Sequence, residues 1–482
     1  MFDCRRFRTS SVDWVAVIVL CSLPLDSIVA ADYQTDCLLG DPASYWSPVV
    51  VDQATEELHE LPVIEDSLVE QVQMLAPQRR PGVQLAQRQQ SSNDPFRERG
   101  LGNVPFMIGD TGAGTCASFS GFLIDAELSH PTMACGRLNI AENNSPLPTD
   151  RLYVSYRHFH NATPVRVFQF ERDYNLDRIT FGGEHTFNNG LWSIEMRMPL
   201  ENRMTSDYFT VDRALGDGTF DIFDGKRTEF GNVSFIMKAL MVERSDCAVS
   251  AGMGVTLPTS RDFHYSAEIV DFIFFPSLPT FITTRSILVD VVASNETVYL
   301  NPFLSWVCQP TSRFFHQGFL QVEVAANPSH VKVTGDGFNT FDDGVNPPVD
   351  TVTVVPAPGR AELIPQTLLR LNLGWGYILC QNPQADWINQ LTALFEVHYT
   401  TTLNDAAIKT IPEFTFDPFG GIIVTDITVG NLHNRVDIVN LVTGLSANIG
   451  NWVVTNGVTA PVTTGSNRGF DFEYNLQVQR IF

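Results

Sequence analysis

The last thirteen residues of the chain, FDFEYNLQVQRIF (470–482), alternate between apolar and polar side chains. Because successive side chains of a β-strand point to opposite faces, this pattern predicts a strand with one apolar and one polar face. The apolar row is Phe470, Phe472, Tyr474, Leu476, Val478 and Phe482, and the polar row is Asp471, Glu473, Asn475, Gln477 and Gln479. The last strand of a soluble β-sandwich is the alternative that this segment leaves open.

A second pattern, Ile179–Met198, predicts a β-hairpin. Asn189-Gly190 lies between its two alternating arms, and this pair favours a two-residue type I′ turn because both positions need positive φ. That turn sets the register, which sorts the arms into two faces. The apolar pairs are Phe187–Trp192, His185–Ile194, Gly183–Met196 and Phe181–Met198, and the polar pairs are Asn188–Leu191, Thr186–Ser193, Glu184–Glu195 and Gly182–Arg197.

The predicted register places Glu184 directly opposite Glu195. Two like charges in this position destabilise a sheet unless a cation compensates them. Arg197, one diagonal step away, and Arg157 are the candidate cations. The penalty is small in a water-filled lumen and severe in a dry core, so the pair favours a hydrated interior.

Alternating runs continue along the chain and predict about 12–16 strands in total. Two stretches rich in Gly and Asp, Gly216–Gly231 and Gly335–Pro356, are predicted as long loops. Long loops on one side and tight turns on the other are typical of outer-membrane β-barrels. The further predicted strands are Arg151–His160, Val233–Met241, Val249–Leu257, Ile287–Val292, Phe319–Val324, Leu368–Ile378, Leu394–Thr401, Val436–Leu445 and Trp452–Val458.

The N-terminal residues have the pattern of an export signal. A basic region that ends at Arg8 precedes an apolar stretch, Trp14–Leu25, and small residues favour cleavage before Asp32. Residues 1–31 are therefore predicted to be a signal peptide. Residues 32–100 are predicted to be a periplasmic extension with a short helix and a disordered polar linker. Contact with peptidoglycan, plugging of a lumen, and a solvated leader are alternative roles for this extension.

Composition narrows the class of protein further. Aromatic residues make up 11% of the chain, with 34 Phe, although the mean hydropathy is only −0.01. Alternating lipid-facing and lumen-facing residues produce such a mixture. No segment after residue 31 has about 18 unbroken apolar residues, which excludes a helical membrane protein. The net charge of −23 disfavours binding to nucleic acid.

Candidate chemistry is sparse. Asp110-Thr111-Gly112-Ala113 matches the core motif of aspartic proteases, but the second copy that catalysis requires is absent, so it is interpreted as a Gly-rich turn before the first strand. His158 and His160 share a strand face without a third ligand nearby. The six cysteines after residue 31 leave disulfide pairing open, with Cys116 and Cys135 the closest pair. No enzyme activity, metal or cofactor is predicted.

Three segments resemble known proteins. GRLNIAENNSPLPTDRLYVSYRHFHNA (136–162), DRITFGGEHTFNNGLWSIEMRMPL (177–200) and the terminal strand are similar to a group of planctomycete outer-membrane β-barrel proteins. The resemblance covers about residues 104–482 and implies a barrel in the outer membrane. The terminal strand also resembles the assembly signal of bacterial barrels, which implies recognition by the insertion machinery through Phe470, Phe472, Tyr474, Leu476, Val478 and Phe482.

The sequence therefore predicts an all-β protein whose residues 101–482 form a transmembrane antiparallel β-barrel in the bacterial outer membrane. A porin-like passive channel for small polar solutes or ions is the predicted function. Outer-membrane lipid is a predicted partner, and homo-oligomerisation is left open. The alternatives are a structural or adhesive barrel with a closed lumen and a soluble secreted β-sandwich. The predicted lumen-lining residues are Glu184, Glu195, Arg197, Asp471, Glu473, Asn475 and Gln477.

Overall fold

The computed structural model describes fourteen stretches of the chain, and the signal peptide and the extension predicted for residues 1–100 lie outside them. Within the described part, β-strands make up nearly all of the regular structure, and no helix there is long and apolar enough to cross a membrane. The described stretches are 101–110, 115–120, 125–129, 137–167, 170–202, 207–213, 220–224, 228–274, 282–342, 349–352, 359–385, 387–416, 422–465 and 468–482.

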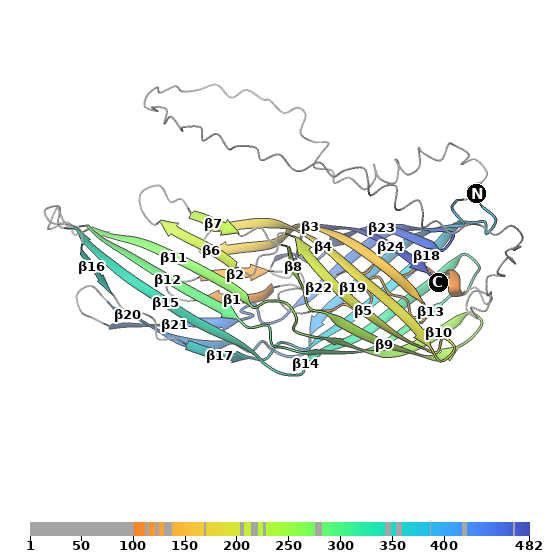
Figure 1. Cartoon of the computed structure of the whole chain (residues 1–482), viewed down its shortest axis with the longest axis horizontal. Coiled ribbons are helices and arrows are strands. Elements are labelled where there is room, and N and C mark those ends of the chain that lie inside the picture. The colour runs from red at the N-terminus through yellow and green to blue at the C-terminus, as the bar shows by residue number, and fades with distance from the viewer. Residues whose placement is uncertain are drawn as a thin grey trace, which may run out of the picture. The chain divides into compact units, whose positions relative to one another are not determined.

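Twelve antiparallel strands form a closed β-barrel (Figure 1). Each strand pairs with the next along the chain, and the last, β24, closes the barrel by pairing with the first, β3. The predicted all-β barrel of about 12–16 strands is therefore confirmed. The barrel strands are β3 (Arg151–Val167), β4 (Phe170–Phe187), β5 (Trp192–Asn202), β9 (Ser234–Glu243), β10 (Cys247–Thr256), β13 (Tyr299–Cys308), β14 (Phe314–Ala325), β18 (Leu368–Gln381), β19 (Gln390–Thr402), β22 (Asp437–Ile449), β23 (Trp452–Pro461) and β24 (Phe472–Ile481).

The two ends of the barrel differ in their connections. Short turns link β4 to β5, β9 to β10, β13 to β14, β18 to β19 and β22 to β23, and all of them lie at one end, here called the tight-turn end. Arg151 and Ile481 pair there, so the barrel begins and finishes at this end. At the opposite, long-connection end, most links between barrel strands carry further strands. This is the asymmetry that the sequence predicted.

The strands outside the barrel pair with one another, and some of them pair with barrel strands (Figure 1). A second sheet has the order β16-β15-β12-β11-β6-β7, with β17 paired to β15, and β6 runs parallel to β11. In the first sheet, β1 pairs with β2 and β21, and β2 pairs with β3. The bounds are β1 (Thr115–Ser120), β2 (Asp125–Ser129), β6 (Asp207–Arg213), β7 (Phe220–Asp224), β8 (Thr228–Phe230), β11 (Phe263–Phe274), β12 (Ile282–Ala293), β15 (Ser329–Asp342), β16 (Val349–Val352), β17 (Gly359–Leu363), β20 (Lys409–Phe416) and β21 (Ile422–Gly430).

Two predictions about loops were wrong. Gly216–Gly231 contains β7 and β8, and Gly335–Pro356 contains the end of β15 and all of β16. Their Gly and Asp residues disfavour strands locally, but pairing with neighbouring strands overrides local propensity.

The predicted hairpin is confirmed in its register. β4 and β5 pair Phe187 with Trp192, and every predicted pair from there to Phe181–Met198 is formed. In the turn, Asn189 and Gly190 have φ values of +57° and +79°, and Asn188 is also left-handed at +53°. The N–H of Leu191 donates to the Asn188 carbonyl at 3.2 Å. The Asn-Gly pair therefore sets the register as its backbone preference predicts.

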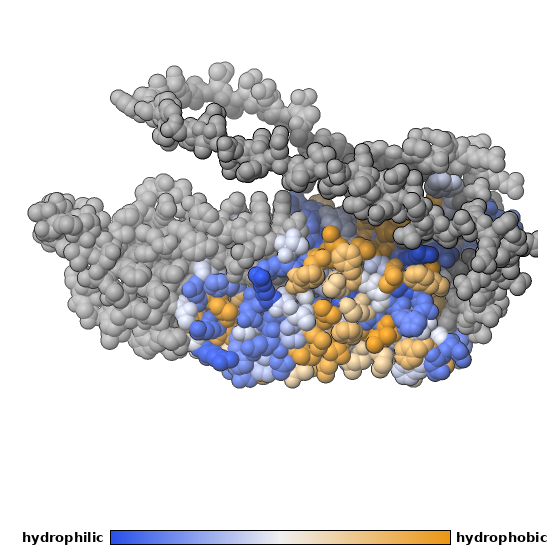
Figure 2. Space-filling model, viewed as in Figure 1, coloured by the Kyte–Doolittle hydropathy of each residue, from blue (hydrophilic) through white to orange (hydrophobic). Residues whose placement is uncertain are grey.

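The barrel is apolar outside and polar inside. Outward-facing Leu152, Val154, Ile194 and Met196 are each more than two-fifths exposed, whereas the alternate, inward-facing positions are buried and largely polar. Figure 2 shows a band of apolar residues on the face in view, with hydrophilic residues beside it. This distribution is the reverse of that of a water-soluble protein, which buries its apolar side chains.

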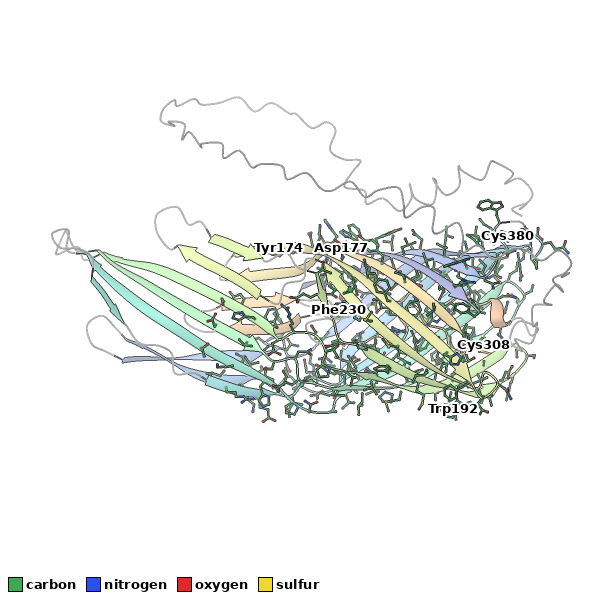
Figure 3. All side chains as sticks on the ribbon, in the orientation of Figure 1. Tyr174, Asp177, Trp192, Phe230, Cys308 and Cys380 are labelled. Atoms are coloured by element: carbon green, nitrogen blue, oxygen red, sulfur yellow. A yellow bond between two sulfur atoms is a disulfide. The ribbon has the colours of Figure 1, made fainter. Side chains whose placement is uncertain are left out.

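A disulfide joins Cys247 to Cys308 across β10 and β13 at the tight-turn end (Figure 3). The two residues are register partners, so the bridge links neighbouring strands. The side chains of Cys116 and Cys135, the pair closest in sequence, lie outside the described part of the structure.

Candidate functional site in the barrel interior

Two stretches of chain occupy the interior of the barrel, residues 101–110 and 137–148, together called the interior segment. They lie against each other, because the Met107 N–H donates to the Asn144 carbonyl at 2.8 Å. Gly109 has a φ of +70°, and a Cβ atom there would lie 2.5 Å from the Glu142 Cα, so this close approach requires glycine.

Side chains from opposite walls hold the first stretch. Glu396 on β19 accepts the N–H groups of Ile108 and Gly109 at 2.7 and 2.8 Å. Gln477 on β24 and Arg157 on β3 donate to the Ile108 carbonyl at 2.9 and 2.8 Å. The backbone polar groups of a buried, non-helical stretch are thus satisfied by inward-facing side chains. Two further side chains donate hydrogen bonds to this stretch: Gln317 to the Pro105 carbonyl and Gln390 to the Asn103 carbonyl.

The second stretch is held in the same way. Glu323 on β14 accepts from the Leu138 N–H at 3.1 Å and pairs with Arg137 at 2.6 Å. Lys238 on β9 donates to the Asn144 side chain at 2.9 Å and to the Ser145 carbonyl at 2.6 Å. These contacts between the wall and the interior segment use polar groups that could equally bind water.

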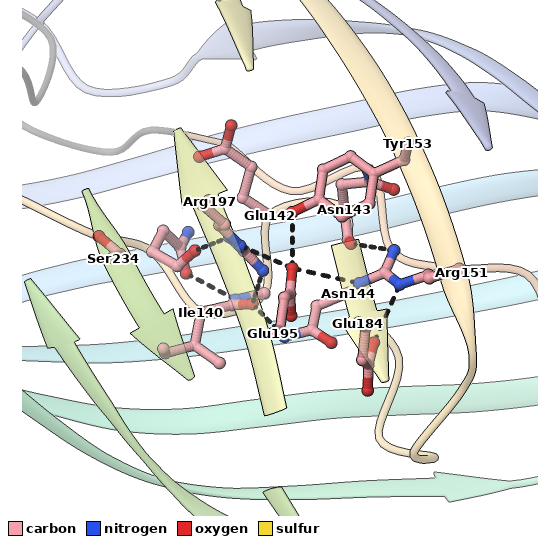
Figure 4. A network of polar contacts seen from close by, with 12 residues as sticks. Ile140, Glu142, Asn143, Asn144, Arg151, Tyr153, Glu184, Glu195, Arg197 and Ser234 are labelled. Carbon is pink, nitrogen blue, oxygen red and sulfur yellow. Dashed lines mark hydrogen bonds and ion pairs between the residues drawn. The ribbon is translucent and has the colours of Figure 1, made fainter. Parts of the chain in front are cut away.

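Glu184 and Glu195 lie opposite each other, as predicted, at the centre of a charged network (Figure 4). The Arg151 guanidinium bridges them, with Nε 2.9 Å from Glu184 and Nη2 3.3 Å from Glu195. Lys238 lies 3.1 Å from Glu184, and Arg197 lies 2.8 Å from Glu195. Three cations thus compensate the two carboxylates.

Arg197 is one of the two cations predicted for this pair, and the prediction for Arg157 was wrong. Arg157 instead pairs with Glu473 on β24 and with Glu142 of the interior segment, the latter at 2.9 Å. The reason is register along β3: Arg151 is the partner of Glu184 on β4, whereas Arg157, further along the strand, is the partner of Arg178 and lies beside Glu473 of β24.

Apolar contacts also hold the interior segment. The Ile108 side chain lies against Gly444 and Gly457, which are register partners on β22 and β23. A Cβ atom on either glycine would lie less than 3 Å from the Ile108 Cδ1. Buried side chains of the segment cluster with inward-facing apolar residues of the wall; the larger cluster is Leu101, Val104, Ile108, Leu147, Ala248, Val307, Phe315, Ile378, Leu394 and Val442.

Most of the predicted lumen residues face the interior, but one does not share their environment. Six of them are buried on inward-facing positions: Glu184, Glu195, Arg197, Glu473, Asn475 and Gln477. Asp471 precedes β24 at the long-connection rim, where it pairs with Arg468 at 2.5 Å. Its neighbour Phe470 is buried against Phe159, with ring centroids 5.5 Å apart. The other apolar residues of this row lie on the outer face: Phe472, Tyr474, Leu476 and Val478.

Several residues of the barrel interior were not predicted from the sequence. Glu323, Glu396 and Lys238 fall on inward-facing positions of strands that the alternation predicts, so their parity was an available signal. The interior segment itself has no periodic pattern that indicates where it lies. Its polar run of residues 142–145 is buried, although composition alone favours an exposed loop.

Asp110 belongs to the interior segment instead of forming only a turn before a strand. It is buried, and its carboxylate accepts hydrogen bonds from Asn139 at 3.0 Å and Asn440 at 2.5 Å. His398 lies 3.9 Å away and also contacts Glu396 at 2.9 Å. Within the described residues, no cluster of three or more His, Cys, Asp or Glu could hold a metal ion.

Comparison with solved structures finds outer-membrane proteins at low similarity. The Pseudomonas putida toluene transporter TodX shares 8% identity, with 78% of this chain and 98% of that chain covered and a TM-score of 0.33. The Ralstonia pickettii toluene transporter TbuX shares 9% identity, with coverages of 69% and 90% and a TM-score of 0.32. CdiB from Escherichia coli shares 10% identity, with 74% of this chain and 67% of that chain covered and a TM-score of 0.28. Likenesses of this strength carry no argument about function.

No protein-family model and no curated protein sequence matches the chain.

Proposed function

We propose that the protein is a bacterial outer-membrane β-barrel. Three observations support this location: the closed barrel leaves no long unpaired edge, its outer face exposes apolar side chains, and its tight turns and long connections lie at opposite ends. The tight-turn end then faces the periplasm. Membership of the planctomycete group, export by residues 1–31 and recognition of the terminal strand by the insertion machinery remain predictions from the sequence.

We further propose that the barrel is a porin-like passive channel for small polar solutes or ions, closed in this conformation by the interior segment. The observation that carries this proposal is the polarity of the wall behind the segment. Asn301, Asn475 and Gln477 are buried and inward-facing, yet each has a side-chain polar atom with no protein partner among the described residues.

A permanently dry core would favour apolar residues at such positions, since an unpaired buried polar group costs about 1–3 kcal/mol. A hydrated passage imposes no such cost. The contacts of the interior segment also support a hydrated passage. Glu396, Gln477 and Arg157 hydrogen-bond to its backbone, and the same side chains could hydrogen-bond to water after the segment is displaced. Displacement of the segment would expose a polar wall that carries both acidic and basic side chains, which screens solutes by size and charge.

A second candidate, a structural or adhesive barrel with a closed interior, is favoured by one observation. The interior segment forms apolar clusters with the wall, which include Ile108, Phe315 and Val442. Such clusters stabilise the closed state. The long connections would then supply the surface that binds partners.

Planar-bilayer recordings of the full-length protein distinguish the channel from the structural barrel. Glu396→Gln keeps the shape of the side chain but replaces the carboxylate by a neutral amide, which leaves one acceptor oxygen for the Ile108 and Gly109 N–H groups. Loss of about 1 kcal/mol from the closed state corresponds to a roughly fivefold rise in the open-to-closed ratio. Thr459→Val on β23 is the matched control, since Thr459 is equally buried but its hydroxyl has no protein partner among the described residues.

Rare openings in the wild type, more frequent ones in Glu396→Gln and no change in Thr459→Val would support the gated channel. Absence of conductance from all three proteins, each folded, would reject the channel and favour the structural barrel.

A further inference from the structure

A groove of about 550 Å³ lies on the outer face of the barrel near the tight-turn end. It crosses β3, β4, β5 and β9, and its apolar part is formed by Leu152, Ile194, Met196 and Phe235. Gly183 is the register partner of both Leu152 and Met196, and the Leu152 side chain lies over it: a Cβ atom on Gly183 would lie 2.8 Å from the Leu152 Cδ2. The volume falls within the roughly 300–1,000 Å³ of small-molecule pockets.

The end of the groove toward the tight turns is polar and carries an acidic group. Asp150 lies there, 2.8 Å from the Nδ1 of His185, which is largely exposed. The Asp150 carboxylate also accepts the N–H and the O–H of Thr186 at 2.7 and 2.6 Å. Its side chain remains about one-third exposed, at 35%. These contacts hold the carboxylate in place while it stays accessible.

A cation lies at the same corner. Arg480 is the register partner of Leu152 on the outer face, and the Phe482 N–H donates to the Asp150 carbonyl at 3.1 Å. The Arg480 guanidinium lies over the rings of Phe482 and Trp452, 5.2 and 5.9 Å from their centroids. Aromatic rings and long basic side chains at a barrel end are typical of the level of lipid headgroups.

We propose that this groove binds one zwitterionic phospholipid that carries a primary ammonium headgroup. The apolar part takes an acyl chain, Asp150 accepts hydrogen bonds from the ammonium, and Arg480 binds the phosphate. Charge complementarity selects this lipid: an anionic headgroup without an amine brings no cation to the exposed side of the Asp150 carboxylate, and a trimethylammonium group has no N–H to donate. The inference rests on the proposed membrane location but not on the channel.

Native mass spectrometry of the full-length protein in detergent measures this selectivity. The probes are phosphatidylethanolamine, phosphatidylcholine and phosphatidylglycerol with identical acyl chains. We expect one ethanolamine lipid to bind about fivefold more tightly than the other two, as for one partly exposed, charge-assisted contact. Asp150→Asn should abolish this preference, and Arg480→Gln should weaken the binding of all three phospholipids to a similar degree.

Met196→Trp fills the groove and should abolish binding of all three lipids. Met253→Trp is its matched control, because Met253 is an exposed, outward-facing methionine on β10 that does not line the groove. Each variant is first checked for heat-dependent migration on gels, so that a misfolded variant is recognised. Arg480→Gln provides an independent test should Asp150→Asn disturb the Thr186 contacts.

Equal binding of the three lipids to the wild type, or an unchanged ethanolamine preference in Asp150→Asn and Met196→Trp, would overturn the lipid site. If the wild type migrates as a barrel and conducts ions but binds the lipids equally, only the lipid site is overturned. A wild-type protein that stays soluble without detergent overturns both the site and the membrane location.

Discussion

Arg151 lies between two carboxylates that the strand register places directly opposite each other. It also donates to the Asn143 carbonyl at 2.7 Å and to the Gln479 side chain at 3.0 Å. It therefore joins β3, β4, β5, β24 and the interior segment through a single guanidinium. At the scale of residues, such shared cations stabilise the described interior: Arg151, Lys238 and Arg197 together compensate Glu184 and Glu195.

Substitution of Arg151 by Met should destabilise the barrel by about 3 kcal/mol, because it leaves the buried Glu184 and Glu195 facing each other with one cation fewer. Urea unfolding in detergent micelles, followed by tryptophan fluorescence, measures this loss. Arg435→Met is the matched control: Arg435 is exposed and pairs with exposed Asp405 at 3.4 Å, so its loss should cost under about 1 kcal/mol. Equal effects of the two substitutions would contradict the proposed role of Arg151.

At the scale of elements, turn chemistry and strand alternation reinforce each other in the β4–β5 hairpin. The turn fixes which residues face each other, and the alternation then separates the outward apolar pairs from the inward polar pairs. A shift by one residue would place Glu184 and Glu195 on the outer face, so the register is strongly specified. Gly190 has the most positive φ of the three left-handed turn residues.

Gly190→Val should destabilise this hairpin by about 1–2 kcal/mol, because a β-branched residue is strained at positive φ. Folding of the urea-unfolded protein into lipid vesicles, followed by tryptophan fluorescence at increasing urea, measures the change. Leu191→Val, one position later and outside the left-handed residues, serves as control and should shift the midpoint much less. An unchanged midpoint for Gly190→Val would mean that the turn does not limit stability.

At the scale of the whole molecule, closure of the sheet determines which polar groups meet. β24 pairs with β3 although they lie at opposite ends of the barrel sequence, and this pairing brings Glu473 to Arg157. Closure also encloses the interior segment and removes the free edges of the twelve strands. The apolar outer face then requires a lipid or detergent environment.

The folded protein should therefore sediment with membranes, require detergent for extraction, and migrate faster on gels before boiling than after it. Compact barrels resist unfolding by detergent at room temperature because their strands are hydrogen-bonded all the way around. Cell fractionation and semi-native electrophoresis measure these properties. Recovery of the protein in the soluble periplasmic fraction, with identical migration before and after boiling, would end the outer-membrane proposal.

The sequence by itself determined most of the barrel strands, their two faces and the register of one hairpin, because alternation and turn preference act over neighbouring residues. Parity alone assigned Glu473, Asn475 and Gln477 to the inside of the barrel. Local composition was insufficient for β7 and β16, whose Gly-rich and Asp-rich surroundings become strands only through pairing with β6 and β15.

Only the tertiary structure decided what fills the barrel. The contact between Ile108 and Glu396 joins residues 288 positions apart, and no periodic signal in residues 101–110 or 137–148 marks them as interior. These residues are buried because inward-facing side chains satisfy their backbone groups, and those side chains surround them only after the sheet has closed. Periodicity along a strand reports the face on which a residue lies; it carries no information about the distant segment that occupies that face.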